Sequence, residues 1–160
     1  MAYSVFDPRE DFRSKIGTTH FLYDADVSCV SVSNDIEDTI WVPLLFPSEV
    51  RGHGEMYPMP FIEMVLVSST GETHNIGGDR RYDTALIDFN LYFTDVDGLT
   101  PYTFEKDVLN KIYNSTVSYR NMVSSCTFIE PLQTREITEF NENKQLVYHY
   151  VITCRGIQYQ

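Results

Sequence analysis

The chain has 160 residues, is 42% hydrophobic and 14% aromatic, and carries a formal net charge of −11 from 23 acidic and 12 basic residues. This length suffices for one domain with its own hydrophobic core, and the composition is that of an ordered globular protein. Binding to phosphate backbones or anionic lipids needs clustered Lys and Arg, so the acidic charge argues against nucleic-acid and membrane-surface binding.

The three cysteines, Cys29, Cys126 and Cys154, are odd in number and far apart, which does not fit a disulfide framework. The N-terminus lacks the basic and apolar regions of a secretory signal, and no window approaches the roughly 18 apolar residues of a membrane span. We therefore expect a protein that stays inside the cell or joins a particle assembled there.

The first 60 residues predict an irregular N-terminal arm with edge segments. Asp7-Pro8 predicts the start of a short helix that ends by Gly17, and residues 25–33 predict a short strand. Residues 39–46 are strongly apolar, but Pro43 cannot donate to a ladder, which predicts an edge strand, a bulge or an irregular segment. The long connection at 47–60 is expected to pack on something, such as a neighbouring subunit.

Two neighbouring antiparallel strands are predicted between residues 61 and 93. F-I-E-M-V-L-V at 61–67 is apolar on both faces, as in the interior of a sheet. In Y-D-T-A-L-I-D-F-N-L-Y-F at 82–93, every second residue from Ala85 to Phe93 is apolar, which predicts a strand with one face on the core. Residues 68–81 predict a flexible, polar hairpin tip that serves as a contact element.

The main helix is predicted at about 101–117. Thr100 can cap it, Pro101 fits its first position, and Phe104, Val108 and Ile112 recur at intervals of four. This pattern predicts a helix packed on one face of the sheet.

A second hairpin is predicted from the segments 131–140 and 145–159. The predicted fold class is therefore α+β: a mostly antiparallel β-sheet with one main α-helix packed on one face, plus the irregular N-terminal arm. We expect a single domain over 1–160, with the arm at 1–60 and the sheet-plus-helix core at 61–160.

The sequence carries no complete catalytic or metal-binding motif. His53-Gly54-Glu55 matches the H-x-E part of a zinc deaminase signature, but the P-C-x-x-C part is absent. Asp95-Val96-Asp97-Gly98 resembles the centre of an EF-hand loop, yet phenylalanines stand where its first and last ligands are needed. Nucleotide-binding glycine motifs and nucleophile motifs are also missing. We predict that the chain is not an enzyme and has no catalytic, cofactor-binding or metal-binding residues.

The aromatic residues point to a protein that functions through contact. Eleven tyrosines and ten phenylalanines exceed what one helix on one sheet needs, and tyrosine is enriched at interfaces because its ring supplies area while its hydroxyl stays hydrogen-bonded. The candidate subunit or partner contacts are Trp41, Met56, Tyr57, Met59, Arg80, Arg81 and Tyr92.

From about Phe61 to Gln160 the order of elements resembles the tail-terminator, or tail-completion, proteins of long-tailed bacteriophages. The similar parts are the paired strands ending I-D-F-N-L-Y-F, the helix E-K-D-V-L-N-K-I-Y and the closing arm L-V-Y-H-Y-V-I-T-C. The first 60 residues differ from the family's usual opening, which is a longer N-terminal helix leading straight into the first strand.

The resemblance implies a structural virion protein that forms a ring, most often homohexameric, on the end of a tail tube. There it would stop polymerisation and join the tail to the head connector. Its partners would be further copies of itself, the tail tube protein and the head-tail connector protein, with DNA passing through without specific binding and no membrane involved. The implied location is the tail or neck of the virion, after assembly in the host cytoplasm.

Two alternative functions follow from the same pattern. The first is another neck or head-completion ring protein of the same particle. The second is a small ligand-binding module, or a small enzyme, that uses a pocket between helix and sheet.

Overall fold

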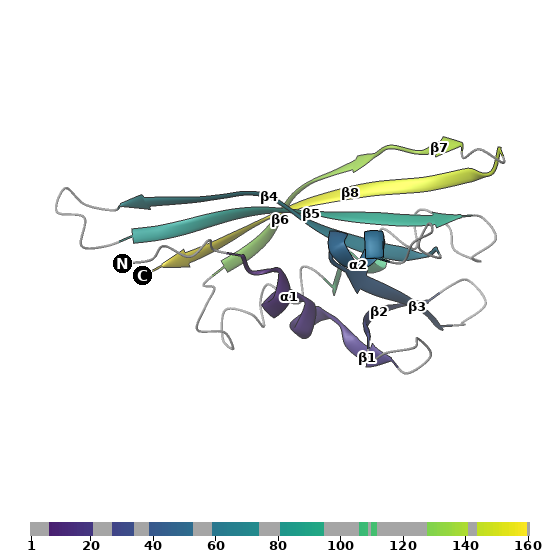
Figure 1. Ribbon diagram of the computed structural model, residues 1–160, viewed down its shortest axis with the longest axis horizontal. Helices are drawn as coiled ribbons and strands as arrows, with labels where there is room; N and C mark the ends of the chain where they lie inside the picture. The colour runs from purple at the N-terminus through teal and green to yellow at the C-terminus, as the bar shows by residue number, and fades with distance from the viewer. Residues whose placement is uncertain are drawn as a thin grey trace.

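The computed structural model describes residues 7–20, 27–33, 39–52, 59–73, 81–94, 106–108, 110–111, 128–140 and 144–159. The fold of these residues is mostly β: a mixed, mostly antiparallel sheet accompanied by short helices. Figure 1 shows long, twisted strands above a smaller layer that contains the N-terminal elements.

The described strands form one eight-stranded sheet in the order β1-β2-β3-β4-β5-β8-β6, with β7 also paired to β8. Their bounds are β1 Thr18–His20, β2 Val27–Ser33, β3 Thr39–Leu45, β4 Phe61–Thr73, β5 Arg81–Thr94, β6 Phe128–Glu136, β7 Glu139–Phe140 and β8 Leu146–Tyr159. The pairs β4–β5, β5–β8 and β6–β8 are antiparallel, which confirms both predicted hairpins.

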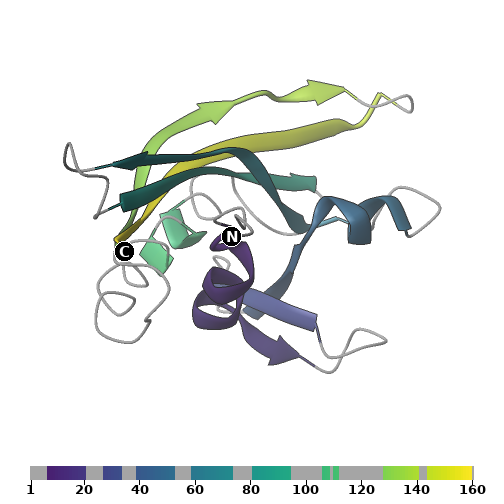
Figure 2. The same cartoon turned by 60° about the vertical axis from the view of Figure 1, so that its left-hand side comes forward.

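The N-terminal third is not an irregular arm, and that prediction was wrong. β2 pairs with β3 from Cys29 to Ser33, and β3 joins the long strands through a short parallel pairing at Leu44 and Leu45. Because only these two residues pair with β4, the strands β1–β3 turn away beneath the long strands (Figure 2). Pro43 lies outside the parallel pairing, so its missing N–H removes no bond to β4.

The core lies between the long strands and this N-terminal layer. One cluster of buried residues joins Phe12 of α1 (Arg9–Ile16), Val30 and Val42 of β2 and β3, and the apolar face of β5. The apolar face of β5 consists of Ile87, Phe89, Leu91 and Phe93, as the alternation predicts. Phe12 is 0% exposed, and its ring centroid lies 5.2 Å from that of Phe89.

The start of α1 lies one residue later than predicted, because Pro8 rather than Asp7 is the N-cap and the helix begins at Arg9. The Arg9 amide donates to Asp7 Oδ1 over 3.1 Å, so the carboxylate satisfies one of the free amides of the first turn. The Gly17 amide donates to the Arg13 carbonyl at the other end. A Cβ on Gly17 would lie 2.9 Å from that carbonyl and 3.0 Å from Ser28, so this close approach to β2 needs glycine.

Two further predictions need revision. The polar tip predicted at 68–81 is shorter, because β4 continues to Thr73 and β5 begins at Arg81. Of the predicted helix at 101–117, residues 106–108 and 110–111 are helical, while the rest lie outside the described residues. Val108 is buried in the core cluster, and Lys111 Nζ donates to Ser31 Oγ over 2.7 Å. This segment therefore packs under the sheet beside β2.

Candidate interaction surface

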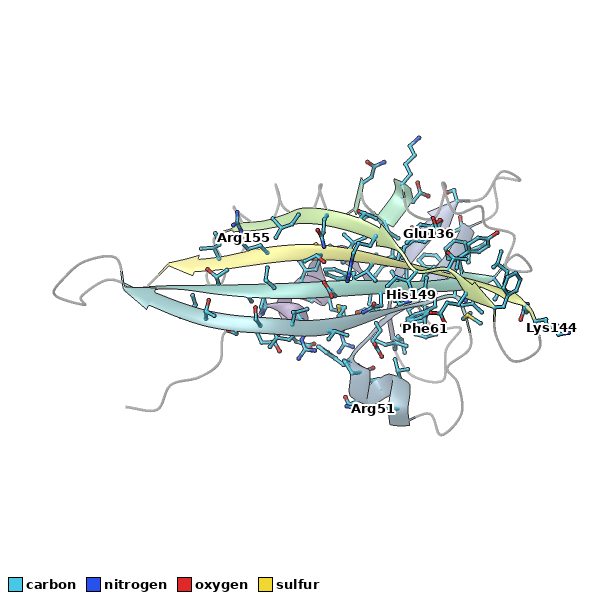
Figure 3. All side chains as sticks on the ribbon, turned by 90° about the horizontal axis from the view of Figure 1, so that it is seen from above. Arg51, Phe61, Glu136, Lys144, His149 and Arg155 are labelled. Carbon is cyan, nitrogen blue, oxygen red and sulfur yellow. The ribbon has the colours of Figure 1, made fainter. Side chains whose placement is uncertain are left out.

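The long strands β4, β5 and β8 have a second face, directed away from α1 and the core. We call it the outer face, and it is seen in Figure 3 with Phe61 and His149 labelled. No described helix covers the strands in this view. The strand registers place nine of its residues in three rows: Phe61, Tyr92 and His149; Glu63, Asn90 and Val151; Val65, Asp88 and Thr153.

The first row is a stack of three rings. The Phe61 and Tyr92 centroids are 4.9 Å apart with an interplanar angle of 26°, and the Tyr92 and His149 centroids are 4.2 Å apart at 18°. Phe61 is buried, while Tyr92 and His149 are half-buried. Cross-strand aromatic pairs of this kind hold neighbouring strands together and fix their register. Tyr92 therefore stabilises the fold of the monomer through its two ring contacts, while part of its side chain remains exposed at the surface.

Hydrogen bonds connect the polar residues of the outer face. His149 Nε2 lies 2.9 Å from Asn90 Oδ1, an oxygen that only accepts, so the neutral imidazole donates through this nitrogen. The Thr153 hydroxyl donates to Asp88 Oδ1 over 2.6 Å, and Arg135 approaches the other oxygen of Asp88 at 3.9 Å. These contacts connect β5, β8 and β6. The surface is therefore polar, and these polar side chains bind one another.

Protonation of His149 is expected to destabilise the fold. Burial lowers the pKa of this imidazole; Glu139 opposes the effect and Arg135 adds to it. Because the pKa is lower in the folded state, the unfolded chain takes up a proton first as the pH falls. The free energy of unfolding should therefore fall as the pH drops below about 6.5, the ordinary histidine value.

Urea unfolding at pH 7.5 and pH 5.8 measures this effect. His149→Gln keeps a hydrogen-bond donor but cannot titrate, so its stability should change less between the two pH values than that of the unaltered chain. An equal change in both proteins would assign the pH dependence to other groups.

Three of the seven predicted contact residues have described side chains: Trp41, Met59 and Tyr92. Trp41 lies half-buried in β3, Met59 lies half-buried just before β4, and Tyr92 lies in the aromatic stack. Arg81 is the first residue of β5, but its side chain lies outside the described residues, as do Met56, Tyr57 and Arg80.

Sequence reasoning missed the apolar side chains that are in fact exposed. Val67 is 53% exposed and lies at a bulge between Leu66 and Ser68, where it has no opposite residue in the β4–β5 register. Leu132, Ile137 and Phe140, which are 47%, 38% and 72% exposed, lie along β6 and β7. The clue in the sequence was the polar residues beside these three: Q-T-R-E at 133–136 separates Leu132 from Ile137, and T-E at 138–139 precedes Phe140.

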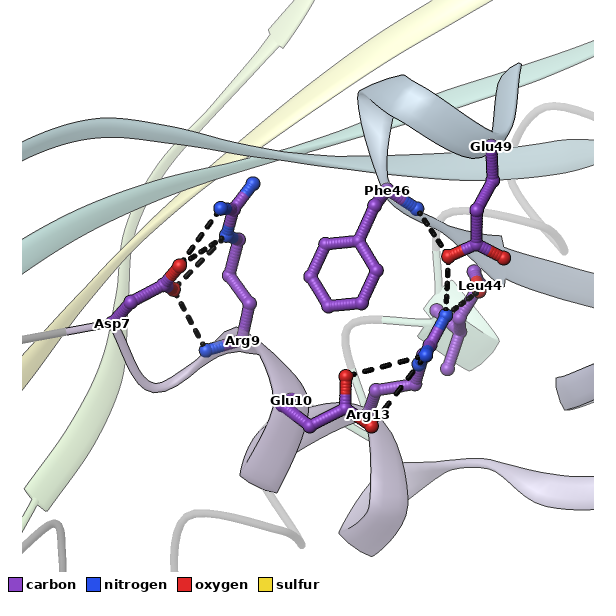
Figure 4. Close-up of polar contacts among 7 residues, drawn as sticks. All are labelled: Asp7, Arg9, Glu10, Arg13, Leu44, Phe46 and Glu49. Atoms are coloured by element: carbon purple, nitrogen blue, oxygen red, sulfur yellow. Dashed lines mark hydrogen bonds and ion pairs between the residues drawn. The ribbon is translucent and has the colours of Figure 1, made fainter. Parts of the chain in front are cut away.

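A cluster of charges links α1 to α2 (Pro47–Gly52) on the other side of the molecule (Figure 4). The guanidinium carbons of Arg9 and Arg13 lie 5.0 and 4.4 Å from the centre of the Phe46 ring. Arg13 also binds Glu49 Oε1 at 2.7 Å, and Arg9 donates to the Met64 carbonyl. Each charge has a partner in the same chain, so this cluster fastens the N-terminal helix to β3 and β4 and serves as structure.

The described residues offer little for covalent or metal chemistry. Burial raises the pKa of the Cys29 thiol to about 11 and also raises that of Cys154, so both remain protonated and poorly nucleophilic at neutral pH. Within the described ranges no three His, Cys, Asp or Glu side chains come together to hold a metal ion.

None of the helices in the described part of the chain has both the length and the apolar character to span a membrane. Neither a protein-family model nor a curated protein sequence matches this chain.

Proposed function

We propose that this protein is a structural subunit of a bacteriophage tail, forming a ring that terminates the tail tube and joins it to the head connector. The proposal rests on the resemblance of residues 61–160 to tail-terminator proteins. In it, the helical residues 106–108 and 110–111 belong to one helix at about 101–117, packed on the core face of the sheet. This is the α+β arrangement that the resemblance implies.

The observation that carries the proposal is the outer face of β4, β5 and β8. It is broad, it is polar and aromatic, and no described helix lies over it in Figure 3. Beside it, Val67 exposes an aliphatic side chain at the β4 bulge. Half-buried aromatic residues amid paired polar groups are typical of surfaces that pack on another subunit. In a cyclic ring, such a face meets a different surface of the neighbouring copy.

The charge of the chain fits the same role. A net charge of −11 repels DNA, so a ring with an acidic channel would let DNA slide through without adhering. No specific DNA contact is needed for a subunit that only stops tube growth and presents a surface to the connector.

Particle mass and electron microscopy test this function. We expect rings of six copies in solution, or free subunits that assemble into such rings at the ends of purified tail tubes. Val67→Glu should reduce ring formation or end binding at least tenfold, because it places a charge on the contact surface. Ser48→Glu adds the same charge on the exposed side of α2 and should leave assembly intact.

The alternatives give different results in the same experiment. A ring that binds connectors but ignores tube ends would point to another neck or head-completion protein. A stable monomer that binds neither tubes nor connectors would remove the structural proposal and favour a ligand-binding module.

A further inference from the structure

β6 and β7 together form one edge of the sheet. β6 is the last strand in the sheet order, and β8 is its neighbour among the described strands. Glu136 lies opposite Tyr150 and Glu139 opposite Val147, three residues further along both strands, so β7 keeps the register of β6. The Ile137 amide donates to the His149 carbonyl over 2.7 Å between them. We call the segment from Gln133 to Phe140 the β6–β7 edge.

The backbone of this edge presents alternate residues to the outside. In an antiparallel ladder, residues whose backbone groups face the neighbouring strand alternate with residues whose groups face away. The backbone groups of Ile137 face β8, so the positions whose backbone groups face outward are Thr134, Glu136, Thr138 and Phe140. An edge with outward N–H and C=O groups is a template for a further strand. The exposure of Ile137 and Phe140 adds apolar area along it.

We propose that two copies of this chain pair edge to edge, antiparallel, through Thr134–Phe140, about a twofold axis at Ile137. In this arrangement Arg135 lies opposite the partner's Glu139, and Glu139 lies opposite the partner's Arg135. Each Ile137 lies directly opposite the partner's Ile137. Opposite charges on directly facing residues stabilise a strand pair. The edge is thus complementary to itself, which identifies the occupant as a second copy of the chain.

Neighbouring registers lack this complementarity. A shift by one residue would set outward-facing backbone groups against inward-facing ones, so only shifts by two residues keep the ladder. One such shift places Glu136 opposite the partner's Glu136, which is repulsive. The other places Glu139 opposite the partner's Ile137 and leaves Arg135 without a facing carboxylate. The register centred on Ile137 alone pairs both charges.

The same edge limits how far pairing extends. A bulge between Pro131 and Gln133 breaks the ladder at the upstream end of the edge. Bulges and charged side chains are the features that keep natural edges from unlimited aggregation. Because both copies use the same edge about a twofold axis, the pairing closes as a dimer. It goes beyond the proposed ring and does not rest on it; added to a head-to-tail ring, it would join two rings back to back.

A cysteine on the axis tests the register directly. Ile137 is in a non-hydrogen-bonded pair with its copy, where Cα atoms are about 4.5 Å apart, a separation that permits a disulfide. In a Cys126→Ser background, Ile137→Cys should form covalent dimers under mild oxidation. Thr134→Cys is the matched control, because two such cysteines would lie roughly 20 Å apart along the strands. Equal cross-linking of both variants, or of neither, would overturn the proposal.

A charge swap tests the complementarity. Glu139→Arg should weaken dimerisation by about tenfold or more in sedimentation, since it sets two arginines against each other in both halves. Adding Arg135→Glu restores the opposite charges and should restore the dimer. Failure of the double variant to recover, with both proteins folded by circular dichroism, would contradict the register.

Two further readouts separate this edge from other contacts. In a mixture with a Thr18→Cys chain, Ile137→Cys should still cross-link to itself; preferential linkage to Thr18→Cys on β1 would assign the edge to a head-to-tail contact instead. In the Val67→Glu background, the Ile137→Cys dimer should persist even when the ring is lost. The failure of one proposal is therefore distinguishable from the failure of the other.

Discussion

Replacing Phe12 by alanine is expected to lower the free energy of unfolding by about 3–5 kcal/mol, the range typical of a fully buried phenylalanine. Phe12 is fully buried in the core cluster, and its ring packs on Phe89 of β5. Removing it deletes apolar contacts and leaves a cavity between α1 and the long strands, which the fixed backbone of the sheet cannot fill.

Phe140→Ala is the matched control, because it is the same chemical change at a side chain that is 72% exposed. Its effect should stay within about 0.5 kcal/mol. Urea unfolding of both variants, at protein concentrations low enough to keep the chain monomeric, measures the difference. Similar stabilities for the two variants would mean that α1 does not belong to the core.

The arrangement of the N-terminal third shows what sequence patterns leave open. Local chemistry marked the helix correctly, because Asp7, Pro8 and Gly17 act within one or two turns of their neighbours. The place of β1–β3 in the sheet depends on a parallel pairing of only two residues of β3 with β4. Such long-range pairing leaves no periodic trace in the sequence, so an irregular arm was the economical but wrong interpretation.

The long strands were predictable because their alternation is strict. Ala85 to Phe93 point to the core at every second position, as expected from a period of two. The extension of β4 through Ser69 to Thr73 was not predictable, because serine, threonine and glycine favour turns. Pairing with β5 overrides this preference, since it satisfies the backbone of both strands.

The candidate surface was only partly accessible from the sequence. The abundance of tyrosine suggested contact, but Tyr92 also stacks on His149, which lies far along the chain and meets it only through the β5–β8 register. The exposed edge depends on β8 lying between β5 and β6. The order of the strands in the sheet therefore differs from their order in the chain, where β6 follows β5 directly.

Tyr92 allows the roles of fold and contact to be separated. Tyr92→Ala should lower the free energy of unfolding by about 2–3 kcal/mol, because a half-buried ring is lost together with its stacking on Phe61 and His149. Tyr92→Phe keeps the ring and both stacks, so its cost should be below about 1 kcal/mol.

Replacing Tyr92 by phenylalanine also leaves the charge of the protein unchanged at neutral pH. Burial raises the pKa of the Tyr92 hydroxyl, with Glu63 and Glu139 adding to the effect, so the group is uncharged at neutral pH and its removal alters no electrostatic balance. Urea unfolding and the assembly assay are then read together. A normal fold with impaired ring formation in Tyr92→Phe would assign the hydroxyl to a subunit contact. A fully stable Tyr92→Ala chain would contradict the stacking role, because a ring that holds β4, β5 and β8 together cannot be removed without cost.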